Sequence, residues 1–280
     1  MIRQPIVVIA GHIDHGKSSI LEKVKGISIT KGESGGITQS IKSYNIPIKA
    51  IEKCCGSLLK TLNQKINIPG LLFLDSPGHA AFNNMRKRGG NLADIAILTI
   101  DINEGVKDQT LEVLEILKQY KTPFIIALNK IDLISGWRTD KTVNIISSIN
   151  SQSERVQQEL DKRLYEILGK LSEHNINSER FDRISDYTKQ VAMIPVSAKT
   201  EEGIPELLMV LTGLAQKYLE DSLKITEEGE GKAIILEVQE DVGVGTTLDI
   251  ILYDGQIKKG DQIVIAGLNG PIVTKVKGLF

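Results

Sequence analysis

Gly11-His12-Ile13-Asp14-His15-Gly16-Lys17-Ser18 is the stretch that decides the fold. It follows a wholly apolar run, Ile6–Ala10, and opens a segment of helical character. A strand, a G-x-x-x-x-G-K-S loop and a helix in this order predict a phosphate-binding loop. Glycine allows the tight turn in which successive backbone N–H groups point at phosphate oxygens, and the helix N-terminus adds a favourable dipole.

Each polar residue of this loop has an expected role. Lys17 reaches the β and γ phosphates as a point charge, and the Ser18 hydroxyl is placed to ligate Mg²⁺. The predicted nucleotide-binding residues here are Asp14, His15, Gly16, Lys17, Ser18 and Ser19. The alternatives are a glycine-rich turn without a ligand, or a zinc site on the loop's histidines and Asp14. A zinc site is disfavoured because the loop backbone must face an anion.

Short apolar runs separated by helical patterns extend this plan along the chain. Runs of this length fit parallel strands that are buried on both faces, and their alternation with helices predicts an open α/β sheet. The expected strands are Ile6–Ala10, Leu71–Leu74, Ile95–Ile100, Phe124–Leu128 and Val191–Val196. The expected helices include Gln109–Tyr120, Pro205–Leu219 and a long one over Ser151–His174. Ile48–Ile68 and the region 151–187, which ends in a charged stretch, are interpreted as surface insertions.

The character of the sequence changes near Leu223. Four β-like runs follow an acidic linker, and Asp254-Gly255 and Asn269-Gly270 are hairpin turn signals. We therefore predict a nucleotide-binding domain of the P-loop class with a mostly parallel sheet over residues 1–224. A partial antiparallel β-barrel over 225–280 follows it. A closed barrel usually needs more strands, so a truncated fragment is expected.

Asp75-Ser76-Pro77-Gly78-His79 follows the expected strand Leu71–Leu74. An aspartate at this strand end suits the water shell of Mg²⁺, and Gly78 can offer its N–H to a γ-phosphate. His79 then lies beside the attacking water. Because phosphoryl transfer depends mainly on positioning and charge stabilisation, we assign His79 to orienting that water. The alternative is an ordinary surface turn.

Two further motifs predict the base. Asn129-Lys130-Ile131-Asp132 follows the strand Phe124–Leu128, and Ser197-Ala198-Lys199 follows the strand that ends at Val196. The Asp132 carboxylate can accept from N1–H and N2–H₂ of guanine, whereas adenine has no N1–H and no amine at C2. Asn129 is expected to tie loops together and touch N7, the Lys130 stem to cover the base, and the Ala198 N–H to meet O6. An ATP-using kinase is therefore disfavoured.

Composition excludes several other classes. The 280 residues carry a net charge of -1, so no global basic field points to nucleic acid. The two cysteines are the neighbours Cys54 and Cys55, which fit reduced thiols better than a disulfide framework. The first apolar run is too short for a signal peptide core or a membrane span. A cytoplasmic protein without a membrane partner is expected.

These motifs resemble those of translational GTPases, and further stretches narrow the resemblance. Lys31–Gln39 is similar to the first switch of the initiation-factor-two family. Arg86–Asp94 and Ser178–Arg183 resemble the archaeal and eukaryotic branch of that family, the five-B type. The resemblance covers roughly Pro5 to Phe280. Ser18, Ser19 and Ser76 stand where threonine is common, and a hydroxyl is kept in each case.

The resemblance implies a GTPase that is stimulated by the ribosome and acts in the joining of the two ribosomal subunits. It implies that Thr38 ligates Mg²⁺ beside Ser18, with Asp75 acting through water, and that Asp14 helps hold a monovalent cation, K⁺ or Na⁺. GTP and GDP are the implied ligands, and other initiation factors are implied partners of a monomer. Initiator tRNA would bind through domains absent from this chain. The alternatives are another translational GTPase, such as a tRNA-delivering elongation factor, and a scaffold that binds nucleotide without hydrolysing it.

Overall fold

The structure, a computed structural model, describes residues 2–28, 42–62, 65–75, 93–140, 143–226, 228–241, 243 and 245–280. These residues form two compact units. One is Gln4–Leu223, and the other combines Lys224–Phe280 with the N-terminal residues up to Arg3. In the part of the chain that is described, no helix is long and apolar enough to cross a membrane.

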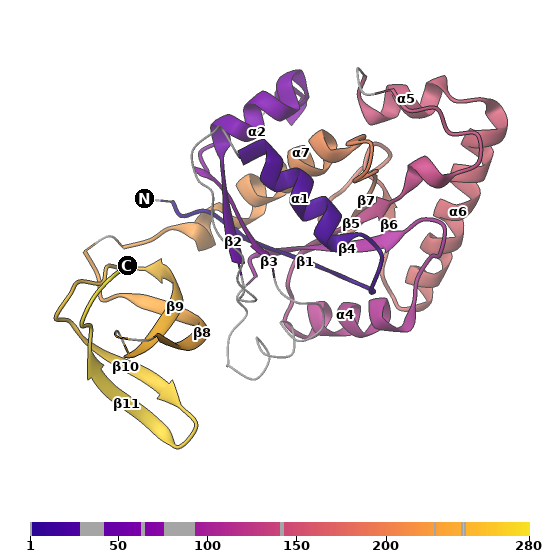
Figure 1. Cartoon of the computed structure of the whole chain (residues 1–280). Coiled ribbons are helices and arrows are strands. Elements are labelled where there is room, and N and C mark those ends of the chain that lie inside the picture. Colours follow the sequence, from indigo (N-terminus) through magenta and orange to yellow (C-terminus); the bar gives the residue numbers. More distant parts are fainter. Residues whose placement is uncertain are drawn as a thin grey trace. The chain divides into compact units, whose positions relative to one another are not determined.

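The larger unit is built on a seven-stranded sheet with the order β2-β3-β1-β4-β5-β7-β6 (Figure 1). Every neighbouring pair is parallel except β2 and β3, which are antiparallel. The strands are β1 Ile6–Gly11, β2 Lys42–Pro47, β3 Gly70–Asp75, β4 Ile95–Asp101, β5 Phe124–Asn129, β6 Ser178–Arg180 and β7 Val191–Pro195. The predicted α/β class with a mostly parallel sheet is confirmed.

The central strands are apolar because both faces of the sheet are covered. All residues of β1 and β4 are buried. The helices α1, α2 and α7 pack together on one face of the sheet, and α4 lies on the other face (Figure 1). The α-helices are α1 Lys17–Ser28, α2 Ile48–Cys55, α4 Asp108–Gln119, α5 Ile145–Ser151, α6 Glu154–Glu173 and α7 Ile204–Leu214. The shorter helical segments are η1 Gly56–Leu62, η2 Ile131–Leu133, η3 Ala215–Leu219 and η4 Glu220–Leu223.

Helix α6 is the long amphipathic helix of the expected insertion. Five apolar side chains on one stripe are buried, namely Val156, Leu160, Leu164, Ile167 and Leu171. Burial of each such side chain contributes about 1.5–3 kcal/mol, which fixes the helix to the domain. The helix begins at Glu154 rather than at Ser151, because α5 ends at Ser151 and the chain is extended at Gln152 and Ser153.

The smaller unit contains four strands, β8 Lys232–Asp241, β9 Gly245–Asp254, β10 Gln262–Gly267 and β11 Gly270–Lys275. They form two separate two-stranded antiparallel sheets, β8-β9 and β10-β11. Gly267 pairs with Gly270, so the predicted hairpin is confirmed, but its two turn residues are Leu268 and Asn269, one position before the predicted Asn269-Gly270.

The prediction of a hairpin turn at Asp254-Gly255 is wrong. Strand β9 ends at Asp254, and β10 pairs with β11 rather than with β9. Gly255 has φ 68° and packs against the carbonyl of Glu230, where a Cβ would lie 2.2 Å from the oxygen. The Asp254 carboxylate meanwhile accepts the Thr226 N–H at 2.9 Å. The dipeptide therefore makes a tight turn against the preceding linker and closes no hairpin.

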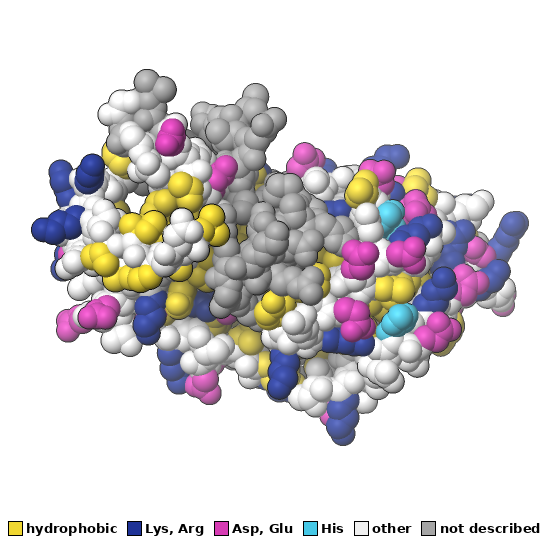
Figure 2. All heavy atoms as spheres, turned by 90° about the horizontal axis from the view of Figure 1, so that it is seen from below, with side chains coloured by type: hydrophobic (Ala, Val, Ile, Leu, Met, Phe, Trp, Pro, Cys, Tyr) yellow, Lys and Arg dark blue, Asp and Glu magenta, His cyan; other side chains and the backbone are white. Residues whose placement is uncertain are grey.

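The described surface agrees with the near-neutral net charge. On the face that Figure 2 shows, acidic and basic side chains of the described residues are interspersed. Opposite charges also pair along helices, as in Arg163 with Glu159 at 2.7 Å on α6 and Lys118 with Glu115 at 3.3 Å on α4.

Candidate functional site

The predicted motifs lie at the carboxyl ends of parallel strands. Strand β1 ends at Gly11, β5 ends at Asn129, and β7 ends at Pro195 just before Ser197. Because β1, β4, β5 and β7 are successive neighbours and parallel, these ends share one edge of the sheet. In open α/β sheets this edge is where ligands bind.

The backbone of the phosphate loop follows from its two glycines. Gly11 has φ 141° and Gly16 has φ 91°, values that other residues rarely adopt. A Cβ on Gly11 would lie 2.3 Å from the carbonyl oxygen of Thr99 on the neighbouring strand β4. A Cβ on Gly16 would lie 2.1 Å from Nδ2 of Asn129. The loop therefore packs directly against β4 and against Asn129 at the end of β5.

Lys17 stands at the start of α1 with its charge only weakly compensated. Its ammonium donates to the carbonyl of His12 at 2.6 Å and forms no ion pair with a described residue. The pKa of Lys17 is lowered because burial disfavours the charged form, and the charge of Asp14 offsets this in part. A cation in this setting gains from an anion beside it. Ser18 and Ser19 follow in the first turn of α1 with exposed side chains.

His15 is fully buried beneath the loop. Among the described residues its ring nitrogens find no hydrogen bond of ordinary geometry, and Nε2 lies 3.8 Å from a carboxylate oxygen of Glu104. The pKa of His15 is lowered because burial disfavours the imidazolium, and the Thr99 carbonyl offsets this in part. The ring also meets that of His12 edge to face, with centroids 4.9 Å apart. The His15 side chain is therefore a buried imidazole whose uncharged form is favoured.

Asn129 joins three loops. Its Nδ2 donates to the carbonyl of His15 at 2.9 Å, and its Oδ1 accepts the N–H of Ala198 at 3.0 Å. The side chain is buried, so both bonds are shielded from water. The N–H of Ala198, which we expected to meet guanine O6, thus has a protein acceptor in this structure. Its contact with the base stays a prediction.

Asp132 is held by the loop that follows β7. The hydroxyl of Ser197 donates to Asp132 Oδ1 at 2.6 Å, which leaves the second carboxylate oxygen without a bond to Ser197. Ser197 is buried, whereas Lys199 in the same motif is exposed. A carboxylate fixed on one side and half-exposed on the other is suited to accept from two neighbouring N–H groups of a base.

Lys130 is held by a residue that sequence reasoning did not select. Its ammonium lies 2.8 Å from Asp101 Oδ2 at the end of β4. Burial by itself would raise the pKa of Asp101, but hydrogen bonds from Lys130 and Asn103 lower it. Asn103 also donates to the carbonyl of Lys130 at 3.1 Å. The available signal was an aspartate directly after the apolar run Ile95–Ile100, at the same edge as the other motifs.

Several predicted site residues lie outside the described residues. These are Thr38, Gly78 and His79. Asp75 is the last residue of β3, the strand on the other side of β1, but its side chain is not described. Their assigned roles remain predictions. Among the described residues no group of three or more His, Cys, Asp or Glu side chains could hold a metal ion.

Comparison with known proteins decides the family. Residues 3–217 match the family described as the elongation factor Tu GTP binding domain. The chain belongs to this family. All the motifs described above fall within the matched residues of this GTP-binding domain.

Relatives that match over the whole chain narrow the relationship. The chain is 54% identical over 279 residues to a protein of Methanopyrus kandleri named probable translation initiation factor IF-2, and 52% identical to one of that name from Sulfolobus acidocaldarius. A crystal structure described as GDP-bound aIF5B from Aeropyrum pernix matches 99% of the chain with a TM-score of 0.89 and 49% identity. The predicted resemblance to the initiation-factor-two family is confirmed. The chain spans 47%, 46% and 46% of these three proteins.

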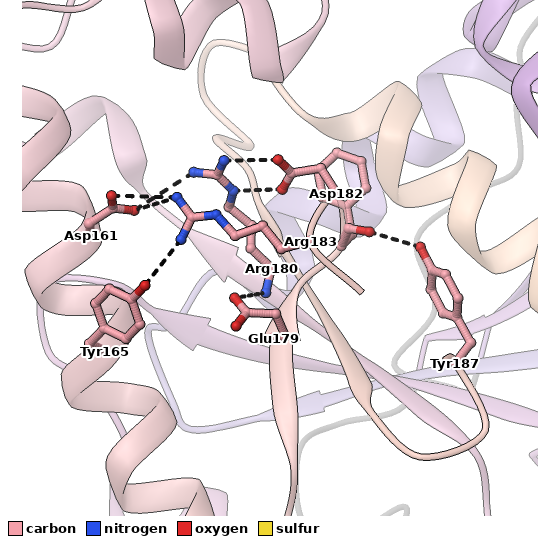
Figure 3. Close-up of polar contacts among 8 residues, drawn as sticks. Asp161, Tyr165, Glu179, Arg180, Asp182, Arg183 and Tyr187 are labelled. Atoms are coloured by element: carbon pink, nitrogen blue, oxygen red, sulfur yellow. Dashed lines mark hydrogen bonds and ion pairs between the residues drawn. The ribbon is translucent and has the colours of Figure 1, made fainter. Parts of the chain in front are cut away.

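The charged stretch Ser178–Arg183 proves to anchor α6 to the edge of the sheet in this GTP-binding domain. Arg180 is buried and makes two hydrogen bonds to Asp182, at 2.6 and 2.9 Å. Asp161 on α6 lies 3.7 Å from Arg180 and 3.2 Å from Arg183, so one carboxylate serves both guanidinium groups (Figure 3). The Tyr187 hydroxyl donates to the carbonyl of Phe181 and ties down the following turn.

Proposed function

We propose that the chain is the GTP-hydrolysing part of a translation initiation factor, binding GTP and GDP at the edge described above. The contact of Asn129 with both His15 and Ala198 carries this proposal, because it brings a phosphate loop and two guanine motifs together. The parallel sheet brings these three loops to one edge, and a nucleotide is long enough to contact all of them there. The similarity to IF-2 and to GDP-bound aIF5B supports the same function.

Within this proposal the phosphates lie against the N–H groups of the loop between Gly11 and Lys17. Lys17 exchanges its bond to His12 for the β and γ phosphates, which relieves its weakly compensated charge. Asp132 reads the base, and the stem of Lys130, held by Asp101, covers its face. The matched N–H donors of guanine favour it over adenine, which would leave the carboxylate unpaired.

The residues present fit Mg²⁺ beside the phosphates. The Ser18 hydroxyl is exposed in the first turn of α1, next to a lysine that no described carboxylate pairs with. We assign Ser18 and Thr38 as direct ligands and Asp75 as a ligand through water, and Asp14 as a ligand of a possible K⁺ or Na⁺ ion. Bound Mg²⁺ would neutralise charge on the phosphate oxygens. His79 orients the attacking water, and the Gly78 N–H meets the γ-phosphate.

The biological role follows from a difference between the GTP and GDP states. GTP holds the segments around Thr38 and Gly78 in one arrangement, and hydrolysis releases them. If the ribosome binds the GTP and GDP states with different affinity, hydrolysis changes how tightly the protein binds the ribosome. We propose stimulation by the ribosome, a role in joining its subunits, and a monomer acting in the cytoplasm. Initiator tRNA and other initiation factors would be partners of the whole protein, with initiator tRNA bound outside this chain.

The smaller unit fits a second domain. Its two hairpins, β8-β9 and β10-β11, form separate two-stranded antiparallel sheets among the described residues. We propose that they belong to an antiparallel β-barrel over residues 225–280, following a GTP-binding domain over 1–224.

Phosphate release measured with and without both ribosomal subunits tests the proposed activity. Wild type should convert GTP and water to GDP and phosphate faster with ribosomes. His79→Ala should keep GTP affinity but turn over about 100-fold more slowly, because the water is no longer positioned. His174→Ala is the matched control, since that histidine lies at the end of α6 away from the site. Equal turnover of His79→Ala and wild type would show that another group positions the water. Nucleotide binding without any phosphate release would favour a scaffold.

A further inference from the structure

Glu202 is a buried carboxylate to which the motifs assign no role. It is 5% exposed and lies five residues after Ser197, just before α7. A buried carboxylate is costly unless it is well hydrogen-bonded, so its presence needs an explanation. Its surroundings supply donors from three separate segments.

Each carboxylate oxygen accepts from one hydroxyl and one N–H group. Oε2 accepts from Thr200 Oγ1 at 2.7 Å and from Trp137 Nε1 at 3.3 Å. Oε1 accepts from Ser148 Oγ at 2.8 Å and from the N–H of Asp140 at 3.3 Å. Glu202 thereby fastens the loop after β7 to helix α5 and to the segment that follows the Asn129–Asp132 motif.

A short chain of hydrogen bonds leads from Glu202 to the carboxylate that reads the base. Glu202 holds the Thr200 hydroxyl, and the Thr200 N–H donates to Ser197 Oγ at 3.0 Å. Ser197 Oγ in turn donates its single hydrogen to Asp132 Oδ1 at 2.6 Å. Because the Thr200 N–H occupies a lone pair of the serine oxygen, the hydroxyl hydrogen is directed at Asp132. The carbonyl of Glu202 also accepts the Ser197 N–H at 2.9 Å, which closes the loop on itself.

We propose that Glu202 is a positioning residue for guanine specificity, which it secures by orienting Asp132 through Thr200 and Ser197. This inference rests on the proposed binding of guanine nucleotides. In this arrangement Glu202 never touches the nucleotide. It keeps Asp132 at the angle at which one carboxylate accepts both N1–H and N2–H₂.

The chemistry requires a carboxylate rather than an amide at this position. The Trp137 and Asp140 donors are N–H groups, which cannot accept a hydrogen bond. Each faces a different oxygen of Glu202. A glutamine in either orientation would point its NH₂ group at one of these donors. Glu202→Gln therefore keeps the size of the side chain but breaks one anchor of the loop.

Competition between GDP and IDP on the full chain tests this inference. IDP lacks the 2-amino group, so the ratio of the two dissociation constants reports the contact that Asp132 makes with it. Wild type should prefer GDP by roughly 10–100-fold, as expected for one hydrogen bond to a charged group. In Glu202→Gln the preference should fall at least about fivefold, because a misdirected carboxylate loses this contact first. A purely structural defect would weaken both nucleotides by the same factor.

Glu206→Gln is the matched control. Glu206 is also a buried glutamate next to the same loop, and its Oε1 accepts the N–H of Ile145 at 2.7 Å. The pKa of Glu206 is raised by burial, so an amide is a mild change there. Among the described residues the hydrogen bond of the Glu206 carboxylate runs to α5 and not toward Asp132, so the GDP preference of this variant should equal that of wild type.

Thr200→Val covers the case in which Glu202→Gln does not fold. It removes the hydroxyl that reaches Glu202 but keeps the N–H that reaches Ser197. Like Glu202→Gln, it should lower the preference for GDP over IDP. Thr200→Ser keeps a hydroxyl at this position and should retain the wild-type preference. A folded Glu202→Gln or Thr200→Val with the wild-type preference would overturn the inference while the proposed function stands. Wild type that binds no guanine nucleotide would overturn both.

Discussion

The side-chain amide of Asn129 donates a hydrogen bond of 2.9 Å to the backbone carbonyl of His15. This contact joins the end of β5 to the phosphate loop at the end of β1, and it is possible because Gly16 has no Cβ to occupy the space. The same amide accepts the N–H of Ala198. One buried side chain therefore sets the spacing between the phosphate and base ends of the proposed nucleotide site.

Asn129→Ala should weaken GDP binding by roughly 10–100-fold, since it removes two buried hydrogen bonds and releases both loops. Isothermal titration calorimetry measures this directly. Asn144→Ala is a suitable control because Asn144 is exposed and its side chain caps α5 by accepting the N–H of Ser147. An Asn129→Ala protein with wild-type affinity would mean that the loops keep their spacing without this amide.

Replacing Gly16 in the phosphate loop and Gly26 in α1 by alanine should change the free energy of unfolding in opposite directions. Gly16→Ala places a Cβ 2.1 Å from Asn129 and forces alanine to φ 91°, so it should cost more than about 1 kcal/mol of stability and abolish tight GDP binding. Gly26→Ala, in helix α1 with no described atom within 4 Å of the added Cβ, should stabilise the protein by about 0.5–1 kcal/mol and leave binding intact. Urea unfolding followed by the emission of the single tryptophan, Trp137, compares the two. Two variants of equal stability would contradict the packing described for the loop.

Asp132→Asn should exchange the base preference. An amide offers its NH₂ to the 2-oxo group of xanthine, where the carboxylate accepted from the amine of guanine. GDP affinity should fall roughly 100-fold or more, and XDP should become the preferred ligand. Titration of both diphosphates against wild type and variant gives the answer. Unchanged GDP preference would count against Asp132 as the reader of the base.

The Arg180–Asp182 pair should make the free energy of unfolding depend on pH. Burial by itself would raise the pKa of Asp182, but the bonds from Arg180 lower it below its unfolded value. The pair therefore stabilises the native state above about pH 4 and loses this effect as the pH falls through the folded pKa. Asp182→Asn should cost about 1–3 kcal/mol at pH 7 and progressively less below pH 4. Urea midpoints over a pH series measure this, and a difference that does not change with pH would argue against an ionic contribution.

The central sheet could be predicted because its strands are apolar on both faces and short. The two strands that escaped prediction lie at its edges. In β2 the buried side chain is Ile46, and the strand has no apolar run that would predict it. Its antiparallel pairing with β3 holds it in the sheet. In β6 the buried residues are Ser178 and Arg180, and Arg180 is buried because Asp182 and Asp161 neutralise it.

The site could be predicted as motifs but not as a network. Spacing indicates that Asp132 and Ser197 follow strands, and parallel pairing of β5 with β7 brings them together. Nothing in the spacing indicates that Asp101 holds Lys130, or that Glu202 gathers donors from three segments. These contacts depend on how loops of different lengths meet at one edge, which is decided by tertiary packing.

Calorimetric titration of the full chain with GDP, and with ADP under the same conditions, tests the central claim most directly. The arrangement of loops around Asn129 predicts binding of one GDP per chain and no detectable binding of ADP, since Asp132 has no partner on adenine. Binding of ADP as tight as that of GDP, or no heat with any guanine nucleotide, would contradict the account.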